Sequence, residues 1–132
     1  MKKSIAILLL IAISFTSNAC TNVKGSGKII MDDRKVSSFT AIRSTGSVDI
    51  EITQGAEEKA TVETDDNIQQ YVEVNTDNGS LTITLKNNVS INTTKLKVHV
   101  TCKTLNHIAV TGSGDVMSMN GIKSSDFSIT QS

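Results

Sequence analysis

The sequence of 132 residues contains no proline and no tryptophan, and aromatic residues make up only 3% of it. After the first twenty residues, the aromatic side chains are Phe39, Tyr71 and Phe127. A carbohydrate-binding cleft normally presents stacked aromatic rings, so their scarcity weakens that interpretation. The sequence also lacks an excess of positive charge, with 13 basic and 13 acidic residues. A nucleic-acid-binding protein carries a basic patch, so nucleic acid is excluded as a partner.

The sequence has no apolar run long enough to cross a membrane. The run over residues 5–13 has nine residues, whereas a membrane-spanning helix needs about 20. It follows Lys2 and Lys3 and precedes small and polar residues, which is the layout of a bacterial export signal. We therefore expect residues 1–19 to be a signal peptide and the protein to be exported.

Cysteine is scarce as well, and its two positions predict different roles. Ser17-Asn18-Ala19-Cys20 resembles a lipobox, although Ser17 stands where Leu or Val is more usual; ordinary cleavage after Ala19 is the alternative. We predict that Cys20 is lipidated, since two or more acyl chains anchor a protein stably to a membrane. Cys102 lies on the apolar face of an alternating segment and is predicted to be a small buried hydrophobe.

The predicted domain order follows from this processing. Residues 20–27 comprise the lipidated cysteine and a linker that is flexible over residues 23–26, and residues 28–132 form one β domain. The predicted location is the cell envelope, with the lipid anchor holding the chain to the outer membrane. Removal of residues 1–19 leaves 11 basic and 13 acidic residues.

The remaining sequence alternates apolar and polar residues with a period of two, which predicts an all-β domain. The expected strands lie at residues 39–44, 47–52, 59–64, 71–75, 81–85, 96–102, 106–111 and 126–131. Asn78-Gly79 stands between two of them and predicts a tight hairpin, because both residues tolerate positive φ. The spacing favours a β-solenoid, a single-stranded β-helix-like stack of short strands, with a β-sandwich as the alternative.

One phrase occurs twice, as STGSVDI from Ser44 and as VTGSGDV from Val110, with equivalent positions 66 residues apart. A phosphate-binding loop would need a strand, a glycine-rich turn with lysine and a helix, and this pattern is missing. The phrase instead predicts a sharp turn, a corner between stacked strands. Its structural residues are Gly46, Asp49, Gly112, Gly114 and Asp115, with the glycines giving positive φ and the aspartates capping loop amides.

The sequence predicts no catalytic residues, metal site or cofactor. His99 and His107 have no cysteine or carboxylate at ligand spacing, so they are expected to be solvated polar residues. The aspartates do not form the tandem pattern of a calcium-binding roll. Arg34 and Arg43 are the only arginines, too few for the groove of a polysaccharide lyase.

Several motifs together resemble the putative auto-transporter adhesin, head GIN domain family. They are Lys24-Gly-Ser-Gly-Lys28, Arg34-x-Val36-x-x-Phe39-x-x-Ile42, Gly46-Ser-Val-Asp-Ile50, Ile52-Thr-Gln-Gly55, Val62-Glu-Thr-Asp-Asp-Asn67, Gly79-Ser-Leu-Thr-Ile83 and Thr111-Gly-Ser-Gly-Asp-Val116. The resemblance covers nearly all of residues 24–132. It implies a β-solenoid-like domain, an origin in Bacteroidetes-type bacteria and a role in adhesion, with no catalytic residues to carry over. Family members run on for further coils, so we expect this chain to be truncated at Ser132.

The leading hypothesis is a non-enzymatic, lipid-anchored envelope protein that binds an envelope glycan or a protein ligand. The alternatives are a glycan-active envelope enzyme and a structural or accessory lipoprotein without a ligand.

Overall fold

The computed structural model describes residues 17, 19–124 and 128–132, and nearly all regular structure within them is β-strand. The exception is one turn of 3-10 helix, η1 (Gln69–Tyr71), which lies between two strands. The prediction of an all-β protein is confirmed. Among the described residues, none forms a helix of the length and apolar character needed to cross a membrane.

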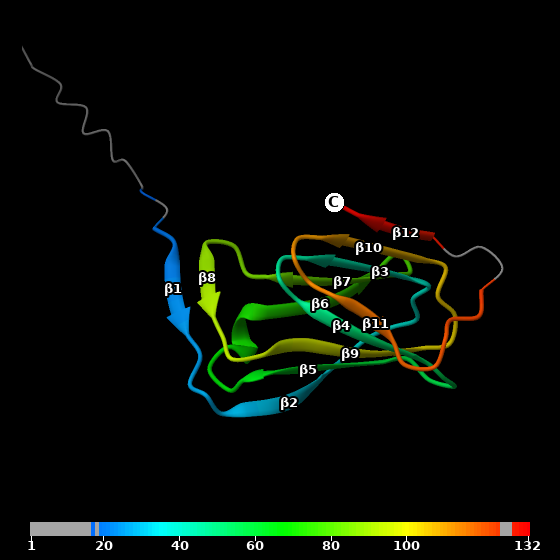
Figure 1. Ribbon diagram of the computed structural model, residues 1–132, viewed down its shortest axis with the longest axis horizontal. Helices are drawn as coiled ribbons and strands as arrows, with labels where there is room; N and C mark the ends of the chain where they lie inside the picture. The colour runs from blue at the N-terminus through cyan, green and yellow to red at the C-terminus, as the bar shows by residue number, and fades with distance from the viewer. Residues whose placement is uncertain (1–16, 18, 125–127) are drawn as a thin grey trace, which may run out of the picture.

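The described strands form two five-stranded sheets with open edges and one two-stranded ribbon (Figure 1). In spatial order, the first sheet contains β12 (Ser128–Gln131), β10 (His107–Thr111), β3 (Ala41–Thr45), β7 (Ser80–Leu85) and β6 (Val72–Asp77). The second contains β11 (Val116–Ser118), β4 (Asp49–Gln54), β9 (Leu96–Cys102), β5 (Lys59–Asp65) and β2 (Ile29–Arg34). The ribbon pairs β1 (Thr21–Lys24) with β8 (Val89–Asn92) in parallel.

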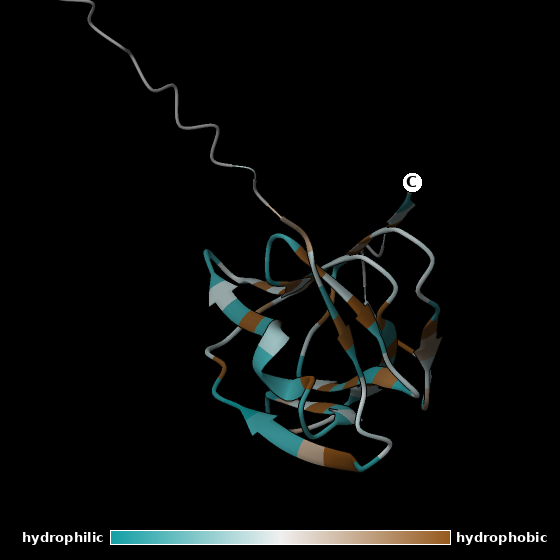
Figure 2. Ribbon diagram, turned by 90° about the vertical axis from the view of Figure 1, so that its left-hand side faces the viewer, coloured by the Kyte–Doolittle hydropathy of each residue, from teal (hydrophilic) through white to brown (hydrophobic). Residues whose placement is uncertain are grey.

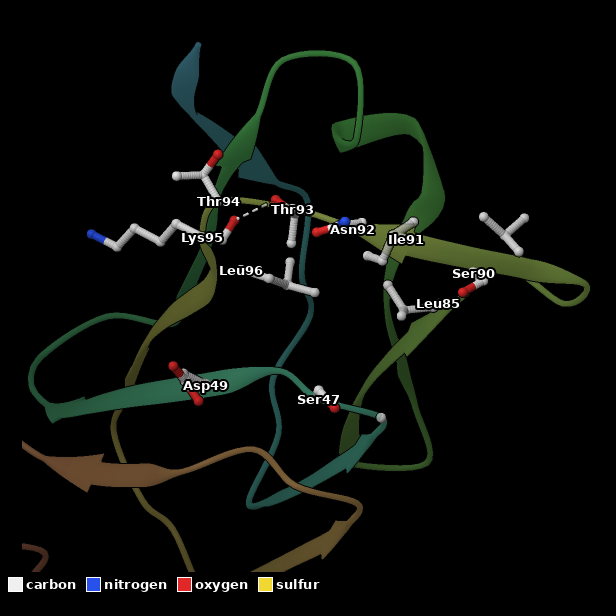
Figure 3. Close-up of a pocket in the computed structure, with 12 residues that line it drawn as sticks. Ser47, Asp49, Leu85, Ser90, Ile91, Asn92, Thr93, Thr94, Lys95 and Leu96 are labelled. Atoms are coloured by element: carbon white, nitrogen blue, oxygen red, sulfur yellow. Dashed lines mark hydrogen bonds between the residues drawn. The ribbon is translucent and has the colours of Figure 1, made fainter. Parts of the chain in front are cut away.

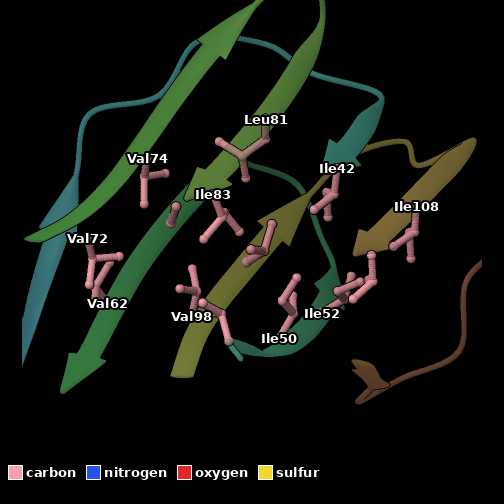
Figure 4. Close-up of a cluster of buried hydrophobic side chains, with 14 of the residues drawn as sticks. Ile42, Ile50, Ile52, Val62, Val72, Val74, Leu81, Ile83, Val98 and Ile108 are labelled. Atoms are coloured by element: carbon pink, nitrogen blue, oxygen red, sulfur yellow. The ribbon is translucent and has the colours of Figure 1, made fainter. Parts of the chain in front are cut away.

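The two large sheets bury one hydrophobic core between them. Figure 4 shows Ile42 and Leu81 of the first sheet on the same cluster as Ile50 and Val98 of the second. Hydrophobic and hydrophilic residues alternate along several strands (Figure 2), because successive side chains of a strand point to opposite faces. Cys102 is completely buried in this core, as predicted, and burial raises the pKa of its thiol.

The predicted hairpin at Asn78-Gly79 is confirmed. Strands β6 and β7 pair in antiparallel register on either side of it, with Asp77 opposite Ser80. Asn78 has a φ of 47° and Gly79 a φ of 74°. A two-residue turn with both φ values positive matches the right-handed twist of the flanking strands, which explains the strength of this local signal.

The repeated phrase coincides with two neighbouring corners of the fold. Strand β10 lies parallel to β3, and β11 lies parallel to β4, with every paired residue 66 positions apart. The amide of Gly46 donates a hydrogen bond to the carbonyl oxygen of Thr111 at 2.8 Å, and the amide of Ile50 donates to that of Asp115 at 2.8 Å. The β10–β11 corner is therefore stacked on the β3–β4 corner.

The backbones of these two corners approach too closely for a side chain to fit between them. Gly46 and Gly112 have φ values of 97° and 123°, which only glycine adopts readily. A Cβ atom at Gly112 would lie 2.7 Å from the carbonyl oxygen of Gly46. At Gly114 it would lie 2.0 Å from that of Val48, so this glycine is needed for space.

The amino-terminal segment differs from the flexible linker expected over residues 23–26. Part of it forms β1, and the following turn is held by the loop after β5. The amide of Ser26 donates to Asn67 Oδ1 at 2.9 Å, and Asn67 Nδ2 donates to the carbonyl oxygen of Lys24 at 2.8 Å. The partner loop lies about 40 residues later in the chain, so the local composition gave no sign of this order.

Two other differences concern the strands. The alternation did not predict β2, β8 or β11, whose side chains are mostly exposed or half-buried. The strand expected at residues 126–131 is seen as β12 from Ser128, and the remainder of that prediction, with Phe127, lies outside the described residues.

The close backbone contact at Gly112 predicts how much stability is lost when a methyl group is added there. Gly112→Ala should lower the free energy of unfolding by roughly 2–5 kcal/mol, because backbone strain and overpacking act together. Gly121 also has a positive φ, of 70°, but has no atom near its potential Cβ position. Gly121→Ala should therefore cost only about 1–2 kcal/mol. Urea unfolding measures both, and equal losses would contradict the stacked-corner explanation.

Candidate functional site

A groove of about 650 Å³ opens beside the β3–β4 corner (Figure 3). One wall is the corner itself, with Gly46, Ser47 and Asp49. The other wall is residues 89–96, which comprise β8 and the loop into β9, and Leu85 at the end of β7 completes the lining. We call this feature the corner groove.

The groove exists because the connection between β7 and β9 is long. Strands β7 and β9 lie parallel to β3 and β4, on the side away from β10 and β11. The chain between them does not turn a short corner but leaves the sheets to form β8. The β3–β7 ladder ends at Ser44, and the β4–β9 ladder begins at Asp49. In the described structure, residues 45–48 therefore have no ladder partner on this side, and the corner groove lies there.

The lining of the corner groove combines aliphatic and uncharged polar side chains. The aliphatic ones are Leu85, Val89, Ile91 and Leu96, and the hydroxyl and amide groups belong to Ser47, Ser90, Asn92, Thr93 and Thr94. Its ionisable lining residues are Asp49 and Lys95. Such a mixture is typical of binding sites, where apolar contact gives affinity and a few polar groups fix orientation.

Asp65 holds the loop wall of the corner groove in place. Its buried carboxylate accepts hydrogen bonds from the Thr93 hydroxyl, from the Thr94 amide at 3.0 Å and from the Gly27 amide at 2.6 Å. These bonds, that from Thr93 above all, lower the pKa of Asp65. A Cβ atom at Gly25 would lie 2.3 Å from this carboxylate. One ionised side chain thus joins the amino-terminal turn to the groove wall.

The structure brings the five predicted turn residues together at one end of the stack. Gly46 and Asp49 line the corner groove, whereas Gly112, Gly114 and Asp115 belong to the corner stacked on the other side. The amide of Asp115 donates to Asp49 Oδ1 at 3.0 Å. The aspartate of one corner therefore caps an amide of the next corner.

The other sequence-predicted site residue, Cys20, is exposed and immediately precedes β1. It lies apart from the five turn residues in the sequence and does not line the corner groove. Within the described residues, no group of three or more His, Cys, Asp or Glu side chains is arranged to hold a metal ion.

A charged cluster on β4, β5, β9 and the loop before β9 reaches the groove at Lys95, and no sequence motif predicted it. His99 Nδ1 lies 2.9 Å from Glu51 Oε2, and His99 Nε2 lies 2.7 Å from Glu63 Oε2. Lys97 pairs with Glu51 at 2.5 Å, and Lys95 pairs with Glu63 at 2.6 Å. The prediction that His99 is a solvated polar residue is wrong, because β4 and β5 flank β9 and bring distant carboxylates to it.

The electrostatics of this cluster bear on the enzyme alternative. The hydrogen bond from Lys97 lowers the pKa of Glu51, and those from Lys95 and His99 lower the pKa of Glu63. A glycosidase needs one carboxylic acid whose pKa is raised, so that it can protonate the leaving group. Both carboxylates are instead held ionised, which does not favour that reaction here.

At the opposite end of β4, a second pair of residues 66 positions apart joins the chain after β11 to β4. The amide of Gln54 donates to Asn120 Oδ1 at 3.0 Å, and Asn120 Nδ2 donates to the carbonyl oxygen of Gln54 at 2.8 Å. The repeat spacing was a signal that could have found this pair, although the two residue types differ.

These features define an all-β protein with stacked corners and an open groove beside them. Residues 38–132 match the family model described as "Putative auto-transporter adhesin, head GIN domain". The match covers most of the chain, and the chain therefore belongs to this family, as its motifs predicted. No curated protein matches the sequence.

Solved structures with a similar fold come from Bacteroides and Parabacteroides species. A putative adhesin from Bacteroides fragilis is 28% identical with a TM-score of 0.77, and the match covers 82% of this chain and 51% of that one. A putative lipid binding protein from Parabacteroides distasonis is 23% identical with a TM-score of 0.77, covering 84% and 49%. A putative adhesin from Parabacteroides merdae is 24% identical with a TM-score of 0.76, covering 84% and 47%. The present chain thus spans about half the length of these structures.

The charged cluster predicts how stability depends on pH. Because the pKa of Glu63 is lower in the folded state than its ordinary value of 4.5, its ionisation stabilises the fold above about pH 4.5. This contribution is lost as the pH falls through the lower folded value. Glu63→Gln should therefore reduce stability at pH 7 and flatten the acid limb of the stability curve below about pH 5.

The control for this prediction is Glu57→Gln, which removes the same charge at an exposed position. It should leave the acid limb nearly unchanged. Urea unfolding at several pH values measures both variants, and equal pH dependence in wild type and Glu63→Gln would contradict the prediction.

Proposed function

We propose that the chain is a non-enzymatic, lipid-anchored protein of the bacterial cell envelope that binds a ligand in the corner groove, as an adhesin does. The observation that carries this proposal is the groove itself. It is open to solvent and has a mixed aliphatic and polar lining. It is bordered by corner backbone that has no ladder partner on the groove side among the described residues. The names of the family and of the similar structures, adhesin and lipid binding protein, agree with a binding role.

The absence of an enzymatic activity is part of the proposal. Two carboxylates of the charged cluster have lowered pKa values and bind lysines, so they lack the character of an acid–base pair. The ionisable groups lining the corner groove are one aspartate, which caps the neighbouring corner, and one lysine, which pairs with Glu63. These contacts support binding over turnover.

The proposed anchor and the groove lie at the same end of the chain's fold. Cys20 immediately precedes β1, and β1 pairs along its length with β8, which lines the corner groove (Figure 1). Lipidation of Cys20 would therefore place the groove near the membrane surface. We propose the outer membrane as the site of attachment.

The fold is proposed to be a β-solenoid-like stack. Support comes from the parallel ladders of β10 on β3 and of β11 on β4, with their constant spacing of 66 residues. The antiparallel pairs β2–β5, β5–β9 and β6–β7 fit the β-sandwich alternative.

The anchor is tested by one substitution. Cys20→Ala should move the protein from the membrane fraction into the soluble fraction of fractionated cells, because the acyl chains provide the membrane affinity. Mass spectrometry of the wild-type amino terminus provides the control. An unmodified Cys20, or a disulfide between Cys20 and Cys102, would contradict the lipoprotein assignment.

The binding role is tested on intact envelope material. The purified protein should be retained by envelope preparations and show no turnover in a panel of glycan hydrolase and lyase assays. Ser47→Arg should reduce retention, because the long charged side chain fills the corner groove. Ser113 occupies the equivalent position in the stacked corner, is exposed and does not line the groove.

Ser113→Arg is therefore the matched control and should leave retention unchanged. Turnover above background would favour the glycan-active enzyme. If Ser47→Arg leaves retention unchanged, the corner groove is not the binding site. If the wild-type protein is not retained at all, a structural lipoprotein without a ligand is favoured.

A further inference from the structure

We infer that the ligand of the corner groove is an extended polypeptide segment that adds as a strand to the free edge of β8. This inference rests on the proposed function, since it identifies the class of ligand for the same groove.

Strand β8 has a free edge. The ribbon contains two strands, and among the described residues β8 pairs with β1 alone. All four residues of β8 line the corner groove, whereas β1 contributes none, so the unpaired edge of β8 borders the groove. Such an edge presents a row of unpaired N–H and C=O groups and is a template for another strand.

The opposite wall of the corner groove also offers unpaired backbone. Residues 45–48 also have no ladder partner on the groove side in the described structure. A strand placed between this corner and β8 would lie between two backbone segments that have no ladder partner on the groove side in the described structure. Four residues of β8 span about 13 Å, enough to pair with a segment of about four residues.

The side chains of β8 indicate the sequence pattern of the ligand. Val89 and Ile91 of β8 are half-buried, whereas Ser90 and Asn92 are exposed. A strand in register with β8 would follow the same alternation, so that every second side chain faces the aliphatic lining at Leu85 and Ile91 and the others face solvent. The predicted ligand therefore alternates apolar and polar residues.

The lining also discriminates between peptide and glycan. No aromatic ring is present among the described residues that line the corner groove, so a sugar would find no ring on which to stack. Main-chain hydrogen bonds and aliphatic contacts are the means by which edge strands recognise peptides. The observations therefore favour a polypeptide.

The wall that receives the strand is already ordered. Asp65 binds Thr93 and Thr94, immediately after β8, and also binds Gly27, shortly after β1. Both ends of the connection from the ribbon to the body are thus held by one carboxylate. A preformed edge reduces the entropy lost on binding.

The experiment uses the full-length purified lipoprotein in detergent and a phage-displayed library of random heptapeptides as the probe. Selected peptides should alternate apolar and polar residues. One such peptide is then synthesised in two forms, unmodified and N-methylated at alternate amides, and its Kd is measured by fluorescence polarisation. N-methylation along the pairing edge should weaken binding about tenfold or more, because several main-chain hydrogen bonds are lost together.

The same binding assay is repeated with the two arginine variants, after circular dichroism has verified that each is folded. Ser47→Arg should weaken peptide binding to a similar extent, and Ser113→Arg should leave it unchanged. Failure to select any peptide, equal binding of the N-methylated form, or equal binding by Ser47→Arg would each overturn the inference.

The peptide inference and the proposed binding role of the corner groove can fail separately. If envelope retention is sensitive to Ser47→Arg but no peptide binds, the corner groove is a binding site for another class of ligand, and the peptide inference is wrong. If a glycan competes for the groove and the peptide does not, the same conclusion holds. If retention is insensitive to Ser47→Arg, the proposed function of the groove itself fails.

Discussion

The close contact between two backbone corners is the constraint on which the rest of the structure depends. At Gly112 and Gly114 the chain passes so near to Gly46 and Val48 that a Cβ atom could not be accommodated at either glycine. This contact fixes β10 beside β3 and β11 beside β4 with one common spacing. Ile42 and Ile108, which pair in the β10–β3 ladder, are then both buried in the core. A shift of one residue would turn every side chain of a strand to the other face.

The β3–β4 corner is covered by another corner on one side only, and the corner groove lies on its other side. On one side, the equivalent corner packs against it: the Gly46 amide donates to the Thr111 carbonyl oxygen, and the Asp115 amide donates to Asp49 Oδ1. On the other side, the connection from β7 to β9 is too long to form a matching corner, and the chain leaves to form β8. The backbone of residues 45–48 is therefore covered on one side and available on the other. One long connection in place of a matching corner thus leaves an open groove beside the β3–β4 corner.

Local signals in the sequence predicted the parts of the fold that depend on local physics. The Asn78-Gly79 turn and the alternating strands around it require only backbone preference and side-chain periodicity. The buried position of Cys102 follows from the same alternation.

Features that depend on contacts between distant segments were not predictable in this way. No local pattern indicated the role of Asp65, because its partners, Gly27 and Thr93, are 38 and 28 residues away in the chain. His99 appeared solvated because its two glutamates come from neighbouring strands. No sequence motif marks the corner groove, because it lies between the end of the β3–β7 ladder and the start of the β4–β9 ladder.

The position of β1 connects the proposed anchor to the proposed site. Strand β1 occupies one edge of β8 and leaves the other edge at the groove, so the wall of the groove is a ribbon whose stability depends on the amino-terminal segment. The turn after β1 is in turn held by Asp65, which also fixes the loop after β8. Tension on the anchored end would thus be transmitted to the groove wall through backbone pairing and one buried carboxylate. If Cys20 is lipidated as proposed, this arrangement would make the membrane attachment part of the structure that presents the proposed ligand-binding edge.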